Sequence, residues 1–392
     1  MSFSAADRAA MAQALRLAER GLYSATPNPR VGCVLTKDDV VVGEGWHRRA
    51  GEPHAEIHAL LLAGGKAQGA TAHVTLEPCS HQGRTPPCAD ALIAAGVRRV
   101  VAAMEDPDPR VSGRGLARLR AAGVAVETGL LEEAARELNI GFIARMTRGR
   151  PWLRLKIAAS LDGRTALNNG ESQWITNTMA RRDGHRWRAR ACAILTGMGT
   201  VREDDPNLDV RDVETDRQPV KIVLDPRLEL SPQARLFASG APLLVVSAVD
   251  DRARAAPLLE KGAEWLCLPD ANGQIDLPAL MRELAARDMN EVHGEAGARL
   301  NGAFIAAGLA DELLLYLAPC LLGDAARPLM VLPEPATLAT RTRLAFHDVK
   351  PLGNDLRLLA RFAGERQAGL MDNASRTAGG GFAPERLTRR SA

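Results

Sequence analysis

The chain has 392 residues with an ordinary globular composition, 46% apolar and 25% charged, and its length predicts two domains. Fifty basic residues balance 47 acidic ones and aromatic residues make up only 4%, which argues against nucleic acid as a partner. The sequence shows neither a secretory signal nor an apolar run long enough to span a membrane, and six cysteines in so long a chain do not suggest a disulfide framework. We therefore expect a cytoplasmic protein without a membrane partner.

In the first half, short apolar strands alternate with helical stretches, a pattern typical of a layered α/β domain. The first helix is expected over Ser4–Gly21, with Ser4 and Asp7 as a capping pair at its start. The other expected strands and helices of this half are Val31–Leu35, Val40–Val42, Ala72–Leu76 and Val97–Ala103 (strands), and His54–Ala63, Ala89–Ala95, Gly115–Ala122 and Leu131–Met146 (helices).

A seam near residues 148–151 separates this half from a second with the same alternation but no repeat of the first. Its expected strands are Trp152–Ala159, Ala193–Thr196, Val220–Leu224, Leu243–Ser247, Glu291–His293 and Leu313–Ala318, and its helices Thr178–Arg190, Arg252–Glu260, Leu277–Arg287 and Leu300–Ala307. From residue 364 the chain is rich in Gly, Ala and Arg without an apolar period, which predicts a disordered tail. The predicted domains are therefore 1–149 and 150–363, followed by a tail at 364–392.

Four residues of the first half predict a catalytic zinc site. His54, Cys79 and Cys88 are good zinc ligands, and three protein ligands leave the fourth tetrahedral position free for water. Zinc acidifies such a water, and Glu56 is placed to carry its proton, which is the chemistry of hydrolytic deamination. Residues two apart on a helix point to different faces, so His54 and Glu56 converge only at a loop-to-helix junction.

The spacing of the cysteines departs from the general zinc-deaminase pattern, in which two residues separate them. Here eight residues lie between Cys79 and Cys88, and the insert adds polar and basic groups suited to an anionic substrate. Two alternatives remain at this point: a structural zinc with His58 or His81 as fourth ligand, or four unrelated residues.

Seven segments resemble the bifunctional deaminase/reductase family of riboflavin biosynthesis, in the family's order and over residues 5–362. They are TPNPRVGCV (26–34), GWHRRAGEPHAE (45–56), TLEPCSHQGRTPPC (75–88), LKIAASLDGRTA (155–166), ESQWIT (171–176), AILTGMGTVREDDPNL (193–208) and GEAGARLNGAFI (294–305). The resemblance implies a cytidine-deaminase-like three-layer α/β/α domain followed by a dihydrofolate-reductase-like α/β domain. It also implies zinc-dependent deamination of 2,5-diamino-6-ribosylamino-4(3H)-pyrimidinone 5′-phosphate, followed by reduction of the ribosyl group to ribityl by NADPH.

The resemblance also implies roles for particular residues. His54, Cys79 and Cys88 match the zinc ligands and Glu56 the proton carrier. The implied deaminase substrate contacts are Asn28, His47, His81, Arg84 and Asp106. The implied reductase substrate contacts are Lys156, Ser172, Arg188, Leu208, Arg211 and Glu295. The implied NADPH contacts are Ala158, Trp174, Thr200, Asp204, Gly297, Ala298, Arg299, Leu300, Asn301, Gly302 and Ala303.

The second half lacks a G-x-G-x-x-G motif after a strand, so a Rossmann dinucleotide site is not indicated. Instead, a glycine-containing loop at residues 294–298 joins an expected strand to an expected helix, which is one way to direct backbone amides at a diphosphate. Such loops are as often plain turns, and the residues do not decide whether Lys156 or Glu295 supplies the proton in the reduction.

Two other functions fit parts of the pattern. A tRNA-type or nucleotide deaminase fused to an unrelated reductase predicts, in its tRNA form, a basic face with interleaved aromatics, which is not evident. A regulatory protein with a structural zinc does not require an acid at Glu56. The family resemblance further implies a small phosphorylated pyrimidine as substrate and a homo-oligomer, a dimer or a tetramer.

Overall fold

The computed structural model describes residues 3–80 and 87–363, and its first half is built on a five-stranded mixed sheet. The strand order is β2-β1-β3-β4-β5, with β1 antiparallel to both of its neighbours and β3, β4 and β5 parallel. The strands are β1 (Gly32–Lys37), β2 (Val40–Trp46), β3 (Thr71–Val74), β4 (Arg99–Ala102) and β5 (Ala125–Thr128).

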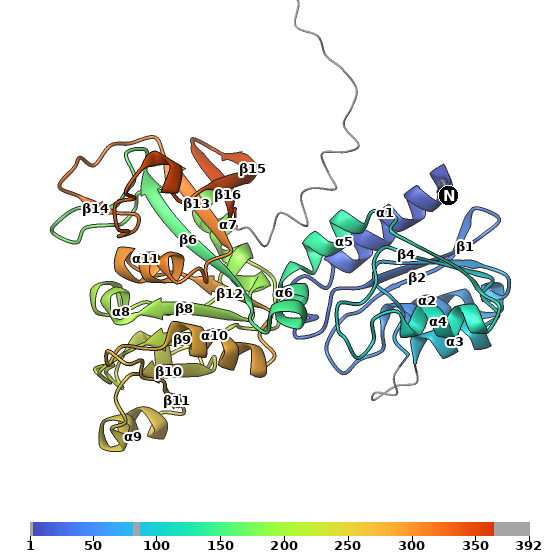
Figure 1. Ribbon diagram of the computed structural model, residues 1–392, viewed down its shortest axis with the longest axis horizontal. Helices are drawn as coiled ribbons and strands as arrows, with labels where there is room; N and C mark the ends of the chain where they lie inside the picture. The colour runs from blue at the N-terminus through green and yellow to red at the C-terminus, as the bar shows by residue number, and fades with distance from the viewer. Residues whose placement is uncertain (1–2, 81–86, 364–392) are drawn as a thin grey trace, which may run out of the picture.

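Helices cover both faces of this sheet, giving the expected three layers (Figure 1). One face carries α1 (Ala5–Glu19) and α5 (Glu132–Leu138), and the other α2 (Ala55–Ala63), α3 (Cys88–Ala94) and α4 (Arg114–Ala121). A 3₁₀ turn, η1 (Gly64–Ala67), follows α2. The predicted cap of the first helix is confirmed, because Ser4 and Asp7 form a reciprocal capping box.

The single helix expected over Leu131–Met146 is a wrong prediction. The structure has two helices, α5 and α6 (Ile140–Arg148), which meet at Asn139. The Asn139 side chain is buried and makes reciprocal bonds with Arg30, accepting from its backbone N–H at 2.7 Å and donating to its carbonyl at 2.9 Å. Because the Asn139 side chain bonds to the backbone of a distant residue, it favours an interruption of the helix at this position.

The second half contains a nine-stranded sheet in the order β11-β10-β9-β8-β12-β6-β13-β16-β15. The strands from β11 to β13 are parallel, and β16 and β15 add an antiparallel edge. They are β6 (Trp152–Ser160), β8 (Ala193–Gly197), β9 (Val220–Leu224), β10 (Leu243–Ser247), β11 (Glu264–Cys267), β12 (Glu291–Gly294), β13 (Glu312–Ala318), β15 (Leu344–Leu352) and β16 (Asp355–Phe362). A two-stranded ribbon pairs β7 (Arg164–Ala166) with β14 (Arg327–Pro328).

The helices of this half are α7 (Thr178–Arg190), α8 (Met198–Asp204), α9 (Arg252–Glu260), α10 (Leu277–Ala286) and α11 (Ala298–Ala306), with short 3₁₀ turns η2 (Arg235–Phe237) and η3 (Leu338–Thr340). Each half has its own apolar core, and the expected α/β class is confirmed for both. All six cysteines are unpaired thiols. Within the described ranges, no helix combines the length and apolar character needed to cross a membrane.

Candidate active sites

The four residues of the predicted zinc site come from the starts of two helices and the end of one strand. His54 has extended backbone and is the N-cap of α2, and Glu56 lies in the first turn of that helix. This is the loop-to-helix junction that the two side chains need in order to converge. Cys79 follows β3, and Cys88 is the first residue of α3.

His54, Cys79 and Cys88 form a compact set of donors. Their ligand atoms lie within 4.8 Å of one another, and the Nδ1 of His54 is 3.6 Å from the Sγ of Cys79 and 3.3 Å from that of Cys88. Nitrogen and thiolate donors brought together at this range fit zinc. Among the described residues no fourth ligand joins the set, so His58 is not a ligand here; His81 lies outside them.

Local interactions prepare the two sulfur atoms for metal. Hydrogen bonding from Cys88 and from His54 lowers the pKa of Cys79 to about 4, against the opposing effect of burial. The backbone N–H of Cys88 also donates to the Sγ of Cys79 at 3.3 Å. The adjacent thiolate and burial raise the pKa of Cys88, so without metal one of the two sulfurs carries the charge.

Glu56 is buried beside this set, and its Oε2 is a buried oxygen without a hydrogen-bond partner in the described structure. Burial raises the pKa of Glu56 to about 7, while the nearby His54 opposes the rise. An unpartnered buried carboxylate oxygen is costly and uncommon, which marks the site as functional rather than structural. A structural zinc would not require this acid.

Two of the predicted deaminase contacts lie against the metal set. The rings of His47 and His54 meet edge to face with their centroids 5.3 Å apart, and the Nε2 of His47 is 3.0 Å from the Nδ2 of Asn28. The carbonyl of Pro53 is 3.2 Å from the Nδ1 of His47, which fixes that ring. Burial lowers the pKa of His47, so its ring is set up as a neutral hydrogen-bonding group.

Asp106, the third predicted contact, is also buried, and burial raises its pKa to about 6. Its Oδ1 accepts from the backbone N–H of Asp108 at 2.8 Å, so the side chain is oriented by its own turn. The other two predicted contacts, His81 and Arg84, lie outside the described residues.

Glu77 is a residue of this site that the sequence analysis missed. Its buried carboxylate accepts from four backbone amides, those of Asp106, Gly113, Gly115 and Leu116, at 2.8–3.3 Å. It thereby fixes the loop that carries Asp106 against the strand end that carries Cys79. Gly115 is required there, because a Cβ would lie 1.9 Å from the carbonyl oxygen of Pro78.

In the second half, several predicted substrate contacts gather near the carboxyl ends of β12 and β6. Glu295 directly follows β12 and forms a two-point ion pair with Arg188 of α7, at 2.5 and 2.7 Å. Arg188 also donates to the carbonyl of Asp209 at 2.9 Å. Two-point guanidinium–carboxylate geometry orients both groups.

Lys156 on β6 and His293 on β12 complete this cluster. Burial lowers the pKa of Lys156, although the adjacent Glu295 opposes the change. His293 is fully buried with its Nε2 3.2 Å from the Oε1 of Glu295, and the sequence analysis did not single it out. Burial alone would raise the pKa of Glu295, but Arg188 and Lys156 hold it well below its usual range.

The remaining predicted substrate contacts differ in whether they contact the residues around Arg188 and Glu295. Arg211 donates its backbone N–H to the Nδ1 of His185 at 3.1 Å and pairs its guanidinium with Asp209, beside the Asp209 carbonyl that Arg188 contacts. Leu208 is buried in a left-handed conformation, with φ of 48°. Ser172 lies between β7 and α7 and makes no hydrogen bond to the described part of the chain.

The predicted NADPH contacts lie along the same sheet edge. The neighbouring parallel strands β8 and β12 are followed by α8 and α11, so both helices begin at their carboxyl ends. Thr200 and Asp204 belong to α8, Gly297 caps α11, and Ala298, Arg299, Leu300 and Ala303 belong to α11. This is where open α/β sheets bind ligands, with helix N-termini facing anionic groups.

Two α11 residues make close contacts with the backbone of neighbouring segments. Asn301 is buried and its Nδ2 donates to the carbonyl of Ala296 at 3.0 Å, while a Cβ on Gly302 would lie 1.9 Å from the carbonyl oxygen of Val331. On the other side of the edge, Trp174 is 68% exposed with the Arg181 guanidinium 4.5 Å from its ring centroid, and Ala158 lies two residues beyond Lys156 on β6.

A zinc-type deaminase centre in one α/β domain, joined to a second α/β domain with a partly buried cluster of basic and acidic groups, fits a bifunctional deaminase and reductase. Comparisons with known proteins agree. The model of the cytidine and deoxycytidylate deaminase zinc-binding region matches residues 4–104, and that of the RibD C-terminal domain matches residues 151–358.

Riboflavin biosynthesis protein RibD of Escherichia coli is 49% identical over 362 residues, covering 89% of this chain and 98% of that protein, and that of Haemophilus influenzae is 45% identical over 370 residues, covering 91% and 98%. Among solved structures, Acinetobacter baumannii RibD superposes with a TM-score of 0.85 at 43% identity, covering 92% of this chain and 99% of that one. A Thermotoga maritima diaminohydroxyphosphoribosylaminopyrimidine deaminase/5-amino-6-(5-phosphoribosylamino)uracil reductase gives 0.81 at 32% identity, covering 91% and 99%.

The chain belongs to the RibD family of riboflavin biosynthesis proteins. It is a bifunctional enzyme with a zinc-binding deaminase domain and an NADPH-using reductase domain, as the sequence predicted.

Proposed function

We propose that the deaminase half acts on 2,5-diamino-6-ribosylamino-4(3H)-pyrimidinone 5′-phosphate and that the reductase half reduces the resulting 5-amino-6-(5-phosphoribosylamino)uracil. The observation that carries the first step is the buried, unpartnered Oε2 of Glu56 beside a three-residue zinc set. The name of the Thermotoga maritima relative supports the same pair of substrates.

Zinc held by His54, Cys79 and Cys88 would supply an acidified water for the deamination. Glu56 would carry one proton of that water to the ring nitrogen and then the second to the amino group, which leaves as ammonia. Asn28 and His47 position the substrate, since they are bonded to each other and lie against His54. Asp106 accepts a hydrogen bond from an amino or hydroxyl group, and His81 and Arg84 bind the anionic end of the substrate.

Bound NADPH would supply a hydride for the reduction, and the first carbon of the ribosyl group could accept it because the glycosylamine can open to an imine. Arg188 and Arg211 bind the 5′-phosphate, and Ser172 and Leu208 line the substrate. Glu295 is ionised and therefore accepts a hydrogen bond from a sugar hydroxyl. Lys156 is the proton donor of this step, because it lies partly buried beside Glu295 and burial lowers its pKa, so it gives up a proton more readily than a free lysine.

The NADPH contacts proposed from the sequence divide into three groups. Gly297, Ala298, Arg299, Leu300 and Ala303, at and beyond the N-terminus of α11, face the diphosphate with Thr200 on α8, and Asp204, at the C-terminal end of α8, contacts the cofactor away from its negatively charged diphosphate. Asn301 supports the loop before α11 through its bond to the carbonyl of Ala296, and Gly302 allows the backbone of Val331 to approach the helix closely. Trp174 and Ala158 flank the nicotinamide side.

Removal of zinc is expected to separate the two reactions. Treatment with a chelator should abolish ammonia release from the diaminopyrimidinone and leave NADPH oxidation by the deaminated product unchanged, because the zinc set belongs to the first half alone. Added Zn²⁺ should restore ammonia release. Equal loss of both activities, or NADPH oxidation at the same rate without the deaminated product, would contradict the assignment.

We further propose domain limits of 1–149 and 150–363, a cytoplasmic location and self-association. The first limit agrees with the positive-φ Gly149 that ends α6 just before β6 begins. The free cysteines suit a reducing compartment. The partner in self-association is a second copy of this chain, and the surface is described next.

The edge strand β15 and its neighbour β16 expose large apolar side chains. Phe346 is 72% exposed, Val349 53%, and Leu344 and Leu356 are at least 40% exposed. Because β15 ends the nine-stranded sheet among the described strands, its outer edge is open to pair with the same strand of a second copy about a twofold axis.

Phe346→Glu is expected to lower the molar mass measured by light scattering to that of the monomer, because a charge in the centre of an apolar contact costs about 2 kcal/mol or more. Leu61→Glu is the matched control, since Leu61 is 74% exposed on α2 of the other domain. A monomeric wild type, or dissociation caused by Leu61→Glu instead, would refute this surface.

A further inference from the structure

A buried carboxylate at the junction of the two domains is surrounded by three arginines. Glu291, fully buried at the start of β12, accepts from Arg30 of the deaminase domain at 2.7 Å, from Arg190 of α7 at 2.8 Å and from Arg154 of β6 at 3.2 Å. Burial alone would raise the pKa of Glu291, but the three guanidinium groups hold it well below its usual range. Arg30 is itself buried, at 6% exposure.

The ion pairs continue from there back to the deaminase domain. Arg154 also pairs with the buried Glu312 of β13 at 2.5 Å, and Glu312 pairs with Arg361 of β16 at 3.1 Å. Arg361 in turn contacts Glu137 of α5 at 2.7 Å. The network thus leaves the deaminase domain at Arg30 and returns to it at Glu137.

Backbone contacts tie the same junction together. The Asn290 side chain donates to the carbonyl of Pro27 at 2.8 Å, and the Arg217 guanidinium donates to the carbonyl of Tyr23 at 3.1 Å. Gly141 of α6 packs so closely that a Cβ would lie 2.3 Å from the Cγ of Glu291. The domains therefore meet through directed, buried contacts.

The three elements that meet at Glu291 are the ones that carry the reductase substrate cluster. Each element contributes one residue to the ion-pair network around Glu291. A second residue, two to four positions away, belongs to the reductase substrate cluster. The pairs are Arg154 and Lys156 on β6, Arg190 and Arg188 on α7, and Glu291 and Glu295 on and after β12. Because helices and strands are stiff over such short spans, the network fixes the relative placement of the cluster.

We propose that the deaminase domain completes the reductase site, with Arg30 as a positioning residue for the reduction. Without the Arg30 guanidinium, Glu291 loses one of its three partners and the balance of buried charge among Arg154, Arg190 and Glu291 changes. β6, α7 and β12 then shift relative to one another, and Lys156, Arg188 and Glu295 lose their mutual geometry. This inference rests on the proposed assignment of those three residues to the reductase substrate.

Within the described ranges, the Arg30 side chain makes no hydrogen bond to the zinc set, Glu56, Asn28, His47 or Asp106. Its guanidinium contacts are Glu291, the carbonyl of Leu138 at 2.8 Å and the carbonyl of Arg190 at 3.3 Å. Ammonia release therefore reports on the folding of the deaminase domain independently of the proposed role.

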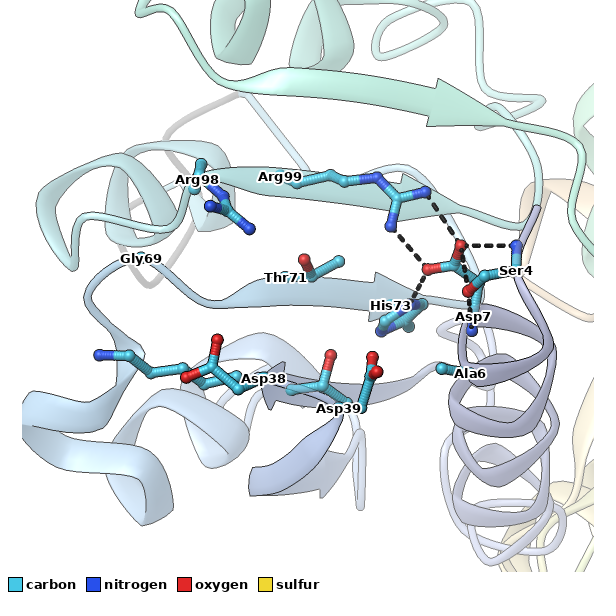
Figure 2. Close-up of a pocket in the computed structure, with 12 residues that line it drawn as sticks. Ser4, Ala6, Asp7, Asp38, Asp39, Gly69, Thr71, His73, Arg98 and Arg99 are labelled. Carbon is cyan, nitrogen blue, oxygen red and sulfur yellow. Dashed lines mark hydrogen bonds and ion pairs between the residues drawn. The ribbon is translucent and has the colours of Figure 1, made fainter. Parts of the chain in front are cut away.

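The test compares both activities in the full chain for Arg30→Met, Arg30→Lys and the control Arg99→Met. Arg99 is a partly buried arginine of the same domain that lines a pocket and pairs with Asp7 at 2.6 Å (Figure 2). It also pairs with Glu127 at 2.8 Å, and neither partner belongs to the network around Glu291. Its replacement therefore removes a comparable ion pair without touching the network.

Arg30→Met is expected to lower kcat/KM for the deaminated pyrimidine by about 10-fold or more, since small misplacements of positioning groups have effects of this order. The KM for NADPH and the rate of ammonia release should stay at wild-type values, because the α11 loop and the zinc set are not bonded to Arg30. Arg30→Lys should recover part of the loss, and Arg99→Met should leave the ratio of the two activities unchanged.

Parallel loss of both activities in Arg30→Met, or a wild-type reductase rate, would overturn the proposal. Glu295→Gln distinguishes an error about Arg30 from an error about the reductase substrate site. If Glu295→Gln keeps reductase activity, the assignment of these residues to the substrate is wrong, and the inference about Arg30 is wrong as well. If it is inactive while Arg30→Met is not, only the inference fails. Should Arg30→Met not fold, Glu137→Gln breaks the other end of the network at a half-exposed position, and an unchanged ratio of activities there would equally overturn the proposal.

Discussion

Glu56→Gln is expected to lower ammonia release from the diaminopyrimidinone by about 10²–10⁴-fold, the usual effect of removing a general acid–base group. Glutamine keeps the shape of the side chain but cannot accept and return a proton. We expect the loss to arise at the zinc site itself, because Glu56 lies in the first turn of α2, whose N-cap is the proposed ligand His54. NADPH oxidation by the deaminated product should be unaffected.

Metal analysis of the same variant distinguishes loss of the proton carrier from loss of the site. Zinc content should stay at one per chain, because Glu56 is not among the donors that converge. Asp90→Asn is the matched control: it removes a carboxylate two residues after Cys88 that is engaged with Arg118 near the surface. Near-normal ammonia release by Glu56→Gln, or zinc loss that accounts for the whole effect, would refute the proposed role.

The sequence predicted the zinc set because the chemistry restricts which residue types can appear there. His54, Cys79 and Cys88 are recognisable as ligands, and the requirement that His54 and Glu56 converge predicted the helix start that the structure has. Glu77 was not recognisable in the same way. Its carboxylate accepts hydrogen bonds from backbone amides 29 and 36 residues further along the chain. Many residue types could stand at such a position, so the sequence does not reveal this role.

The sequence predicted a helix end where neighbouring residues determine it. It did not predict a helix end that is determined by a contact with a distant part of the chain. Ser4 and Asp7 signal a cap by themselves, whereas the break at Asn139 depends on its bonds to Arg30, 109 residues earlier. The β15–β16 hairpin was missed for a related reason. β15 is exposed on both faces, has a bulge between Phe346 and Asp348, and therefore lacks a clean alternation.

The ion-pair network at the domain junction could not be predicted from the sequence either. Arg30 and Glu291 are 261 residues apart, and each is of a type that usually lies on a solvated surface. Only the packing of α6, α7 and β12 shows that these charges are buried together. The sequence could therefore assign two domains and two chemistries without indicating how one domain supports the other.

Lys156→Met is expected to lower the rate of the reduction by about 10²–10⁴-fold, since it removes the proposed proton donor. Methionine has a similar length and volume, and Glu295 keeps its two-point pair with Arg188, so the site should not collapse. Ammonia release and NADPH binding should be unchanged. The matched control is Lys221→Met on β9, a buried lysine of the same sheet that donates to the carbonyl of Leu236 and makes no hydrogen bond to Lys156, Arg188 or Glu295.

The pH dependence of the reduction tests which group donates the proton. Burial lowers the pKa of Lys156, so its donor form is lost as pH rises through a value below that of a free lysine. The wild-type rate should therefore fall on the alkaline side, and Lys156→Met should lack that fall. Glu295 cannot produce it, because its pKa lies well below its usual range and it is already ionised at neutral pH. An alkaline fall that persists in Lys156→Met would mean that another group donates the proton.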